Sequence, residues 1–375
     1  MRYLDAGESH GKGLTAIIEG LPSGLKIDLD KINDELSRRQ KGYGRGGRMK
    51  IETDKAEILS GVRNGYTLGS PVTLFIKNKD FESWAGSMGD GECVITKRTV
   101  TEVRPGHADL SGCVKYGFDD ARNVLERASA RETAIRVAVG GVLKGYLKEL
   151  GVEISSYVKE ICGVKDEGRY AFDELSKAKC SDTGMLDETA SKKAKERIDA
   201  LKEDGDTAGG VVEVRVRGLK SGFGSVMTYG EKLDARLAQG LMSIQAVKGV
   251  EIGLGFGVAN ISGKGVHDEI YYEEGKGYYR ETNRAGGLEG GMSNGEELVL
   301  RIAMKPIPTL MRGLSTVDTE TLAAAKAASE RSDVCAIVAM EIIAEAVVAQ
   351  VLAFAVSELL GGDTMEQVKN RYQEL

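Results

Sequence analysis

The sequence predicts an α+β fold in which a helical layer packs against antiparallel sheets. Short segments rich in β-branched residues indicate strands, and longer segments with apolar residues three to four positions apart indicate helices. These segments interleave without the regular alternation that a doubly wound parallel sheet requires. No stretch of linker-like composition divides the 375 residues, so we expect a single domain over residues 1–375, with a polar surface insertion at about residues 165–208.

The first elements expected along the chain are a helix and two strands. Asp28 or Asp30 can cap a helix, which ends at the glycines of residues 42–47 because glycine-rich sequence does not continue a helix. The segments Ile58–Val62 and Pro71–Ile76 are short and rich in β-branched residues, as strands are. A glycine-rich loop is therefore expected between the first helix and these strands.

The middle of the chain combines helix, polar sequence and strand. Residues 119–150 have helical spacing and predict one long helix or two in succession, with Gly140 and Gly141 as a close-packing point. Residues 151–210 include the most polar part of the chain, and we expect them at the surface. Valine then alternates with charged residues over 212–217, which predicts a strand with one face in water.

The last third of the chain is expected to close the core. Lys232–Val247 has helical spacing, and glycine-punctuated strands are expected over residues 250–305. The segment Val334–Leu360 is long and apolar, but Glu341 and Glu345 fall inside it and would be costly at the centre of a bilayer. We therefore expect a buried helix in place of a membrane span.

Composition excludes several classes of protein. A net charge of -6 argues against general attraction to nucleic acid. Asp5 and Glu8 interrupt the start of the chain, which argues against a secretory signal and predicts a cytoplasmic protein. The cysteines are odd in number and form no Cys-x-x-Cys pair, so we expect reduced, mostly structural thiols. Without clustered histidines, carboxylates or thiolates, we expect no metal site.

Two histidines are the leading candidates for proton transfer. His10 and His107 lie between glycines and charged residues, in Gly7–Gly11 and Arg104–Asp109, whereas His267 has no comparable setting. Imidazole has an unperturbed pKa near neutrality, and glycine allows turns that present a side chain to a ligand. The structural alternative is that each histidine caps a turn or fills a hydrogen-bonding position.

A basic, glycine-rich segment is the candidate anion site. Residues 38–50 contain several cations and no acid, spaced by glycines around Tyr43. Arginine binds phosphate and carboxylate through two parallel hydrogen bonds, so a small polyanion is the favoured ligand. An RNA-binding Arg-Gly segment and a solvated loop are the alternatives, and the single aromatic residue weakens the first of these.

Other motifs are ambiguous or fail. Residues 7–13 miss the phosphate-loop spacing by one residue, and Gly253–Gly257 misses the dinucleotide-binding spacing. Ser129 and Glu132 fit a capping box, but the same helix start could hold a phosphate. Residues 283–295 are dense in glycine, which suits either backbone lying against a flat ligand or a plain hairpin.

Several of these motifs, in this order and from end to end of the chain, resemble the chorismate synthase family. They are Gly7–Gly11, Arg39–Arg48, Ile58–Val62, Arg104–Asp109, Arg127–Thr133, Met242–Ala246, Ala285–Gly291 and Arg331–Asp333. The resemblance implies a 1,4-anti elimination of phosphate and a C6 proton from 5-enolpyruvylshikimate 3-phosphate, giving chorismate in the shikimate pathway. It implies a requirement for reduced FMN without net redox change. The substrate is a small polyanion, which is the ligand that the basic segment favours.

The resemblance also implies roles for individual residues. His10 would donate a proton to the departing phosphate, His107 would lie by the flavin pyrimidine ring, and Asp333 would help to deprotonate flavin N5. For Asp333 the structural alternative is an acid at the N-terminus of the closing helix. The residues implied to contact FMN are Arg127, Ala128, Ser129, Gln245, Ala246, Gly290, Lys305, Pro306, Ile307, Pro308, Thr309 and Arg331. Those implied to line the substrate are Arg39, Arg45, Arg48 and Arg131.

Partners and assembly follow only from the resemblance. Arg39 and Arg45 match positions associated with a reduced nicotinamide nucleotide, so NADPH is expected as an indirect reductant and a separate flavin reductase as a partner. Family structures have a helical layer between antiparallel sheets and assemble as a homotetramer. We expect neither a nucleic acid nor a membrane as a partner.

Overall fold

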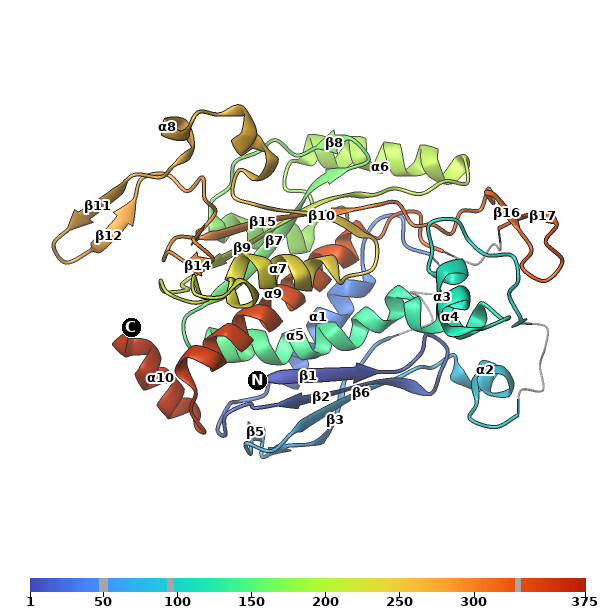
Figure 1. Ribbon diagram of the computed structural model, residues 1–375, viewed down its shortest axis with the longest axis horizontal. Coiled ribbons are helices and arrows are strands. Elements are labelled where there is room, and N and C mark those ends of the chain that lie inside the picture. The colour runs from blue at the N-terminus through green and yellow to red at the C-terminus, as the bar shows by residue number, and fades with distance from the viewer. Residues whose placement is uncertain (47–52, 93–97, 328–331) are drawn as a thin grey trace.

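The computed structural model describes residues 1–46, 53–92, 98–327 and 332–375, in three layers (Figure 1). One outer layer is a four-stranded antiparallel sheet of order β1-β2-β6-β3. Its strands are β1 (Arg2–Ala6), β2 (Gly13–Glu19), β6 (Val72–Lys77) and β3 (Glu57–Ser60). The two expected strands at 58–62 and 71–76 are thus neighbours in this sheet, and the first continues into β4 (Val62–Arg63).

The second outer layer is a five-stranded antiparallel sheet of order β10-β15-β9-β7-β8. Its strands are β10 (Val247–Ile252), β15 (Leu298–Met304), β9 (Gly210–Arg217), β7 (Glu153–Ile161) and β8 (Val164–Lys165). Their side chains alternate along the strands, and the alternate apolar residues of β15 point into the core.

A layer of long helices lies between the two sheets, which confirms the predicted α+β class. These helices are α1 (Leu29–Gln40), α5 (Thr133–Lys148) and α9 (Ile337–Leu360). Asp28 caps α1 by accepting a hydrogen bond from the backbone N–H of Lys31. A Cβ atom at Gly140 would lie 2.3 Å from Cβ of Ala346, so the expected glycine on α5 does let α9 approach closely.

Helix α9 is the hydrophobic axis of the molecule. Among the described residues it is the helix long and apolar enough to cross a membrane, yet 89% of its most apolar window is buried inside the protein. It contacts α5, α1 and both β7 and β9. The expected buried core helix is therefore confirmed, and its two carboxylates, Glu341 and Glu345, are buried with Arg38 and Lys144.

The helical region at 119–150 consists of two helices joined by a short turn. Helix α4 (Arg122–Ala128) is followed by the 3₁₀ turn η3 (Ala130–Glu132), which leads directly into α5. Ser129 interrupts the helix because its backbone is extended, with φ -63° and ψ 140°. Its hydroxyl accepts a hydrogen bond from the backbone N–H of Arg131. The side chain of Glu132 does not complete a capping box, since it binds Arg136 and Gln245 instead.

Two expectations about boundaries are wrong. The helix predicted over 232–247 is α7 (Leu233–Met242), which ends early because the chain reverses through Ala246, at φ 69°, into β10. Strands do not fill residues 250–305, since a 3₁₀ turn at Gly255–Asn260 and a short helix at Gly263–Val266 separate β10 from the projecting hairpin of β11 (Ile270–Glu273). That hairpin is completed by β12 (Gly277–Arg280).

The polar region also differs from expectation. Residues 153–161 form β7, an interior strand of the second sheet, and the predicted strand at 212–217 does not expose one face to water. Glu213 of β9 is only 4% exposed, because η4 (Phe172–Cys180) covers that face and packs Leu175 against Tyr157 of β7. The alternation in the sequence identifies the charged residues on this face, but it does not show that η4 covers them.

The rest of the expected insertion lies outside this sheet. Helix α6 (Glu188–Glu203) packs along one side of it, with Ala190, Ala194, Ile198 and Leu201 buried. A cleft of about 550 Å³ lies between η4 and α6, lined by residues that include Lys177 and Lys195. None of the residues proposed for the functional site lines this cleft.

Shorter elements complete the chain. They are α2 (Phe81–Met88), α3 (Asp109–Tyr116), α10 (Met365–Glu374), β5 (Tyr66–Thr67), β13 (Leu288–Glu289), β14 (Met292–Ser293), β16 (Ser315–Val317), β17 (Ala324–Lys326) and η5 (Tyr229–Glu231). The described cysteines Cys113, Cys162, Cys180 and Cys335 are free thiols, as expected, and Cys93 lies outside the described residues.

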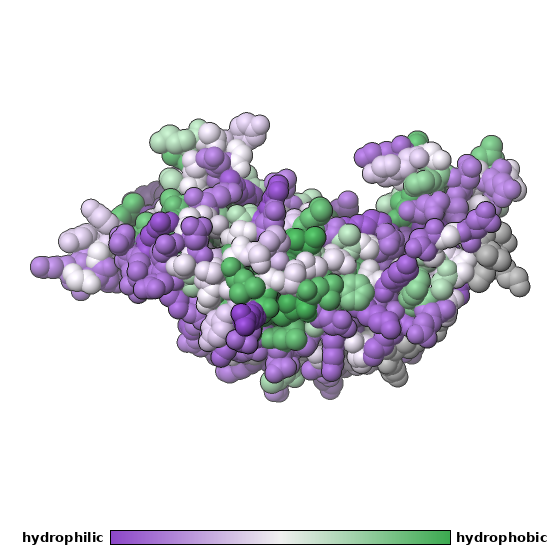
Figure 2. All heavy atoms as spheres, turned by 90° about the horizontal axis from the view of Figure 1, so that it is seen from below, coloured by the Kyte–Doolittle hydropathy of each residue, from purple (hydrophilic) through white to green (hydrophobic). Residues whose placement is uncertain are grey.

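The outer face of the first sheet carries exposed apolar side chains. Leu4 of β1 and Ile17 of β2 are paired across the two strands and are 74% and 42% exposed. Leu59 of β3 and Leu68, which follows β5, are also exposed. Figure 2, which views the molecule from this side, shows apolar atoms gathered near its centre. No helix of the described chain covers this face.

Candidate active site

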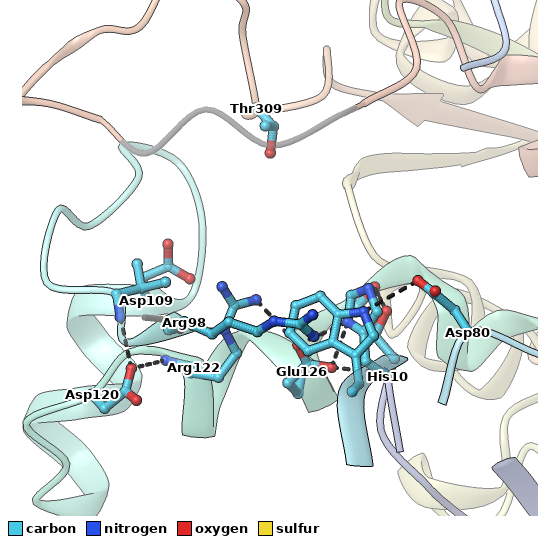
Figure 3. Close-up of polar contacts among 12 residues, drawn as sticks. His10, Asp80, Arg98, Asp109, Asp120, Arg122, Glu126 and Thr309 are labelled. Carbon is cyan, nitrogen blue, oxygen red and sulfur yellow. Dashed lines mark hydrogen bonds and ion pairs between the residues drawn. The ribbon is translucent and has the colours of Figure 1, made fainter. Parts of the chain in front are cut away.

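His10 lies in the turn between β1 and β2 and is held by a buried carboxylate. Its Nδ1 is 2.9 Å from Oε1 of Glu126 on α4, and its backbone N–H donates to Oε2 of the same side chain at 2.8 Å. Figure 3 shows these two side chains facing each other. Nε2 of His10 has no hydrogen-bond partner among the described residues and is not buried. The imidazole is thus fixed at one nitrogen and open at the other.

An aromatic ring and two arginines surround this histidine. The Trp84 ring of α2 stacks on His10 with ring centroids 3.9 Å apart and an interplanar angle of 24°. The Arg98 guanidinium lies 3.6 Å from the Trp84 centroid, and Arg122 donates to Oε1 of Glu126 at 3.2 Å. Burial raises the pKa of Glu126, but its contacts with His10 and Arg122 outweigh burial and keep that pKa below its usual value.

His107 has a similar partner in a separate turn before α3. Its Nδ1 bonds Oδ1 of the fully buried Asp109, and Arg104 donates to Oδ2 of Asp109 at 2.9 Å. Arg104 also donates to Thr309 Oγ1 at 3.0 Å, which joins this turn to the segment after β15. Burial opposes ionisation of Asp109, but His107 and Arg104 hold its pKa well below the usual range. Both candidate histidines therefore contact a carboxylate that an arginine also binds.

The predicted substrate arginines Arg39 and Arg131 converge on Asp54. Arg131 donates to both Asp54 oxygens, at 2.6 and 2.7 Å, and to Oδ1 of Asn78. Arg39 donates to Thr133 and to the carbonyl of Ala130, but its Nη1 is buried without a hydrogen-bond partner among the described residues. Its closest carboxylate oxygen, on Asp54, is 3.7 Å away. This cationic nitrogen is placed to bind an acceptor that the described residues do not supply.

Asn78 links the arginines to the His10 turn. Its amide nitrogen donates to the carbonyls of Glu8 and Gly11, at 3.0 and 2.9 Å, while its oxygen accepts from Arg131. The hydroxyl of Ser129 also donates to Ser9 at 3.3 Å. The proton-transfer candidate and the arginines therefore occupy one hydrogen-bonded framework, although His10 and Arg131 are far apart in sequence.

Arg45 and Asp333 pair beside this cluster. Arg45 Nε lies 3.4 Å from Asp333 Oδ2, and the backbone N–H of Gly46 donates to Asp333 Oδ1 at 2.6 Å. Helix α9 begins only at Ile337, so the alternative role of Asp333 as an acid in its first turn is not supported. Of the predicted site residues, Arg48 and Arg331 lie outside the described residues.

The residues predicted to contact flavin form a connected path through Glu132. Gln245 donates to Oε2 of Glu132 at 2.9 Å, and the backbone N–H of Lys305 donates to the carbonyl of Ala246 at 2.9 Å. The Lys305 ammonium in turn binds the carbonyl of Gly106, beside His107. Burial raises the pKa of Glu132, and its hydrogen bond to Asp5 adds to that effect. The path therefore joins Gln245 to the His107 turn.

Arg127 and residues 305–309 lie at the two ends of this path. Arg127 donates to the carbonyl of Gly7 and to Asp5, both at 3.2 Å, and Ala128 is the last residue of α4. The carbonyl of Ile307 accepts from Thr207 at 2.8 Å. Pro306 and Pro308 flank Ile307, and a Cβ atom at Gly106 would lie 3.6 Å from Pro308, so this segment borders the His107 turn.

Gly290 is the exception among the predicted cofactor residues. It lies in the turn between β13 and β14, and the carbonyl of the next residue, Gly291, accepts from the N–H of Leu233 at the start of α7. Gln245 follows the other end of α7, a ten-residue helix about 15 Å long. The structure therefore brings Gln245, Ala246 and Lys305 together but leaves Gly290 at the opposite end of that helix.

Sequence reasoning missed the residues that hold the predicted ones. Glu126, Trp84, Asp54 and Asn78 were assigned no part, although each contacts a predicted side chain. Glu126 directly precedes the Arg127–Thr133 motif, and its place on the same helix was the available signal. Trp84 is the single tryptophan of the chain, but nothing in the local sequence points from α2 to His10.

The site can bind an anion and move protons at two separate places. Arg39 and Gln245 each carry a buried polar atom, Nη1 and Oε1, that lacks a partner among the described residues. The first is a cationic donor and the second a neutral acceptor, so two chemically different ligand groups fit here. His10 and His107 each have Nδ1 against a carboxylate, which is the arrangement of an oriented general acid or base.

Comparisons with known proteins agree on one family. The chorismate synthase family model matches residues 1–356. Chorismate synthases from Caldicellulosiruptor bescii and Geobacter sulfurreducens are 52% and 54% identical, over 100% of this chain and 99% and 98% of theirs. A crystal structure of chorismate synthase matches with a TM-score of 0.81 and 44% identity, covering 100% of this chain and 96% of that one. The chain therefore belongs to the chorismate synthase family and is a lyase.

Proposed function

We propose that this protein makes chorismate by a 1,4-anti elimination of phosphate from 5-enolpyruvylshikimate 3-phosphate. The observation that carries this proposal is the unpartnered Nη1 of Arg39, buried beside Arg131 and Arg45. Burial lowers the pKa of Arg39 to about 10 although Asp54 opposes the shift, so the side chain stays cationic at neutral pH. A substrate with one phosphate and two carboxylates supplies an acceptor for this Arg39 nitrogen.

His10 is proposed to protonate the departing phosphate. When the ring is protonated, Nε2 is the nitrogen that can donate to a ligand, because Glu126 occupies Nδ1. The turn that carries His10 is bound to Arg131 through Asn78, so a substrate held by the arginines lies within the same framework. The side chains of Asn78 and Arg131 thus connect the proposed substrate site to the proposed proton donor.

The second proton-transfer group, His107, is proposed to face the pyrimidine ring of FMN. Reduced FMN, when bound, supplies an electron-rich ring to the elimination without net redox change. The residues present fit such a group, because Gln245 offers a buried, unpartnered acceptor and Lys305 a cation whose pKa is lowered by burial and by Lys248. His107 holds or shares a proton beside the ring, while Asp109 keeps its Nδ1 occupied.

The remaining assignments rest on the family resemblance. Asp333 is proposed to assist deprotonation at flavin N5, with Arg45 and Gly46 fixing its carboxylate. NADPH is proposed as the source of electrons, acting through a separate flavin reductase, and the protein is proposed to act in the cytoplasm. A homotetramer is proposed, and the exposed apolar residues Leu4 and Ile17 on the outer sheet face support association between copies.

The test is anaerobic incubation of the protein with photoreduced FMN and 5-enolpyruvylshikimate 3-phosphate. We expect chorismate and inorganic phosphate in equal amounts, and slower formation of both with the His10→Ala variant at the same protein concentration. RNA-binding by the Arg-Gly segment is the competing function. Tight RNA binding without phosphate release would support that alternative and contradict the proposal.

A further inference from the structure

We propose that Glu126 and Trp84 are positioning residues that set the tautomer and the ring plane of His10. Neither residue is among those that the resemblance assigns to substrate or cofactor. The inference rests on the proposed function in one respect only, namely that His10 acts as the proton donor. The geometry of the three side chains stands independently of that role.

Glu126 determines which nitrogen of His10 faces the ligand. Its two oxygens lie 2.9 and 3.0 Å from Nδ1, and an ionised carboxylate only accepts hydrogen bonds. Nδ1 of His10 must therefore carry a proton in every state of the ring, and Nε2 alone gains or loses one. Since Nε2 is the open nitrogen, the exchangeable proton is confined to the face that a ligand can reach.

Glu126 is itself held in the charged form. Its side chain is 1% exposed, and it accepts from Arg122 one helical turn earlier as well as from the backbone N–H of His10. Contacts of this kind favour the carboxylate over the neutral acid, which could donate and so permit the other tautomer of His10. Arg122 also donates to the carbonyl of Arg98, which ties the carboxylate to the segment beside Trp84.

Trp84 fixes the plane of the imidazole. The stacked ring prevents rotation about the Cβ–Cγ bond of His10 without loss of contact. The indole is restrained in turn, because its N–H donates to Asp80 at 3.2 Å and Arg98 lies against the ring. Arg98 also donates to the carbonyl of Ser83 at 2.9 Å, next to Trp84 in α2. Hydrogen bonding and stacking together leave His10 one orientation.

The first experiment compares Glu126→Gln with Glu213→Gln. Glu213 is a suitable control because it is a buried glutamate that also pairs with an arginine, Arg215, but lies in β9 and contacts neither candidate histidine. Solid-state ¹⁵N NMR of protein labelled at histidine reports the tautomers directly, and only three histidines contribute. We expect neutral His10 to be protonated at Nδ1 in the wild type and in the control, and to show both tautomers in Glu126→Gln.

The same variants are then assayed for chorismate formation. A neutral amide in place of the carboxylate is expected to lower kcat by about 10²-fold or more, by analogy with other carboxylate–histidine pairs, and to change KM by less than about threefold. Glu213→Gln is expected to keep wild-type kcat. Because the NMR measurement needs no substrate, absence of turnover in the wild type would contradict the proposed function and not the tautomer assignment.

Two substitutions of Trp84 separate stacking from bulk. Trp84→Phe retains a stacked ring and is expected to keep kcat within about threefold of the wild type, whereas Trp84→Leu is expected to lose at least about tenfold. A single His10 tautomer in Glu126→Gln, or equal kcat in Trp84→Leu and Trp84→Phe, would overturn the corresponding half of the proposal.

Discussion

Nη1 of Arg39 lies 3.7 Å from Oδ2 of Asp54, too far for a hydrogen bond, although Arg131 is bound to both oxygens of the same carboxylate. Asp54 therefore orients the two arginines while satisfying only one of them. A buried cation with an unused donor costs free energy in the absence of a ligand. We infer that this cost is offset when an anion binds.

Replacing Arg39 with Gln is expected to impair catalysis more than folding. Loss of a charge-assisted hydrogen bond to the substrate is worth about 1.5–3 kcal/mol, which corresponds to a decrease in kcat/KM of about 10- to 150-fold. Steady-state kinetics under anaerobic conditions and thermal unfolding measure the two effects. Unchanged kcat/KM would remove Arg39 from substrate binding.

The neighbouring Arg38 provides a matched comparison. Its guanidinium pairs with Glu35 and lies near Glu341 and Glu345 in the core, whereas Arg39 bonds Thr133 and Ala130. Arg38→Gln removes one of the two cations, Arg38 and Lys144, that pair with the buried carboxylates Glu35 and Glu345, so we expect a loss of stability. Folded Arg38→Gln protein should nevertheless bind substrate with wild-type KM, which separates the two adjacent arginines.

Asp109→Asn is expected to lower turnover through His107. The amide can donate to Nδ1, so the imidazole is no longer confined to one tautomer, and a decrease in kcat of about 10²- to 10⁴-fold follows from comparable carboxylate–histidine pairs. Asp268→Asn is the control, since Asp268 is also buried and accepts from Thr282, Arg284 and Ala285 away from both histidines. Equal kcat in the two variants would contradict a role for Asp109.

Gln245→Leu is expected to weaken flavin binding. The substitution removes the buried Oε1 acceptor and the bond to Glu132, at a cost of about 1–3 kcal/mol or about 5- to 150-fold in Kd. Quenching of FMN fluorescence during titration measures this Kd. Gln239→Leu changes an exposed residue of α7 in the same way and should leave it unaltered. Equal Kd values for the two variants would place flavin elsewhere.

The buried carboxylate of Glu341 predicts a pH dependence of stability. Burial, with Glu345 nearby, raises its pKa from 4.5 to about 8, although Arg38 and Lys144 oppose the shift. Between these pH values the folded protein holds a proton that the unfolded chain has released, so stability falls as pH rises from about 4.5 to about 8 and levels off above. Glu341→Gln should remove this slope and raise the melting temperature at pH 8 relative to the wild type.

Glu345 provides the opposite case one turn along α9. Lys144 and Arg38 lower its pKa although burial opposes them, so its ionised form contributes stability above the ordinary carboxyl pKa that is lost as pH falls through the lowered value. Glu345→Gln should therefore destabilise the protein at neutral pH. Melting curves of both variants over the same pH range test the assignment, and parallel curves would contradict it.

Local sequence patterns predicted where helices and strands lie better than they predicted which segments cover them. The 3.6-residue spacing identified α1, the long apolar stretch identified α9, and valine alternation identified β9, because each pattern depends on neighbours in the sequence. The cover over Glu213 comes from residues 172–180, whose position no periodicity encodes. The end of α7 depended on Ala246, where a left-handed backbone reverses the chain toward β10.

The candidate site divides in the same way. His10, His107 and Arg39 could be predicted because their residue types and the glycines beside them are visible in the local sequence. Glu126, Asp54 and Trp84 did not, since a buried glutamate, a loop aspartate and a helical tryptophan look ordinary until the fold brings them to a histidine or an arginine. The roles of these three residues follow only from contacts between segments that are far apart in the sequence.

The central claim is that this protein carries out an elimination that needs reduced flavin but does not consume it. The most direct measurement is the amount of chorismate and phosphate formed per reduced FMN under anaerobic conditions, with flavin absorbance followed at the same time. We predict many turnovers per flavin, equal amounts of the two products and flavin still reduced at the end. Oxidation of one flavin per chorismate, or phosphate release without chorismate, would contradict the claim.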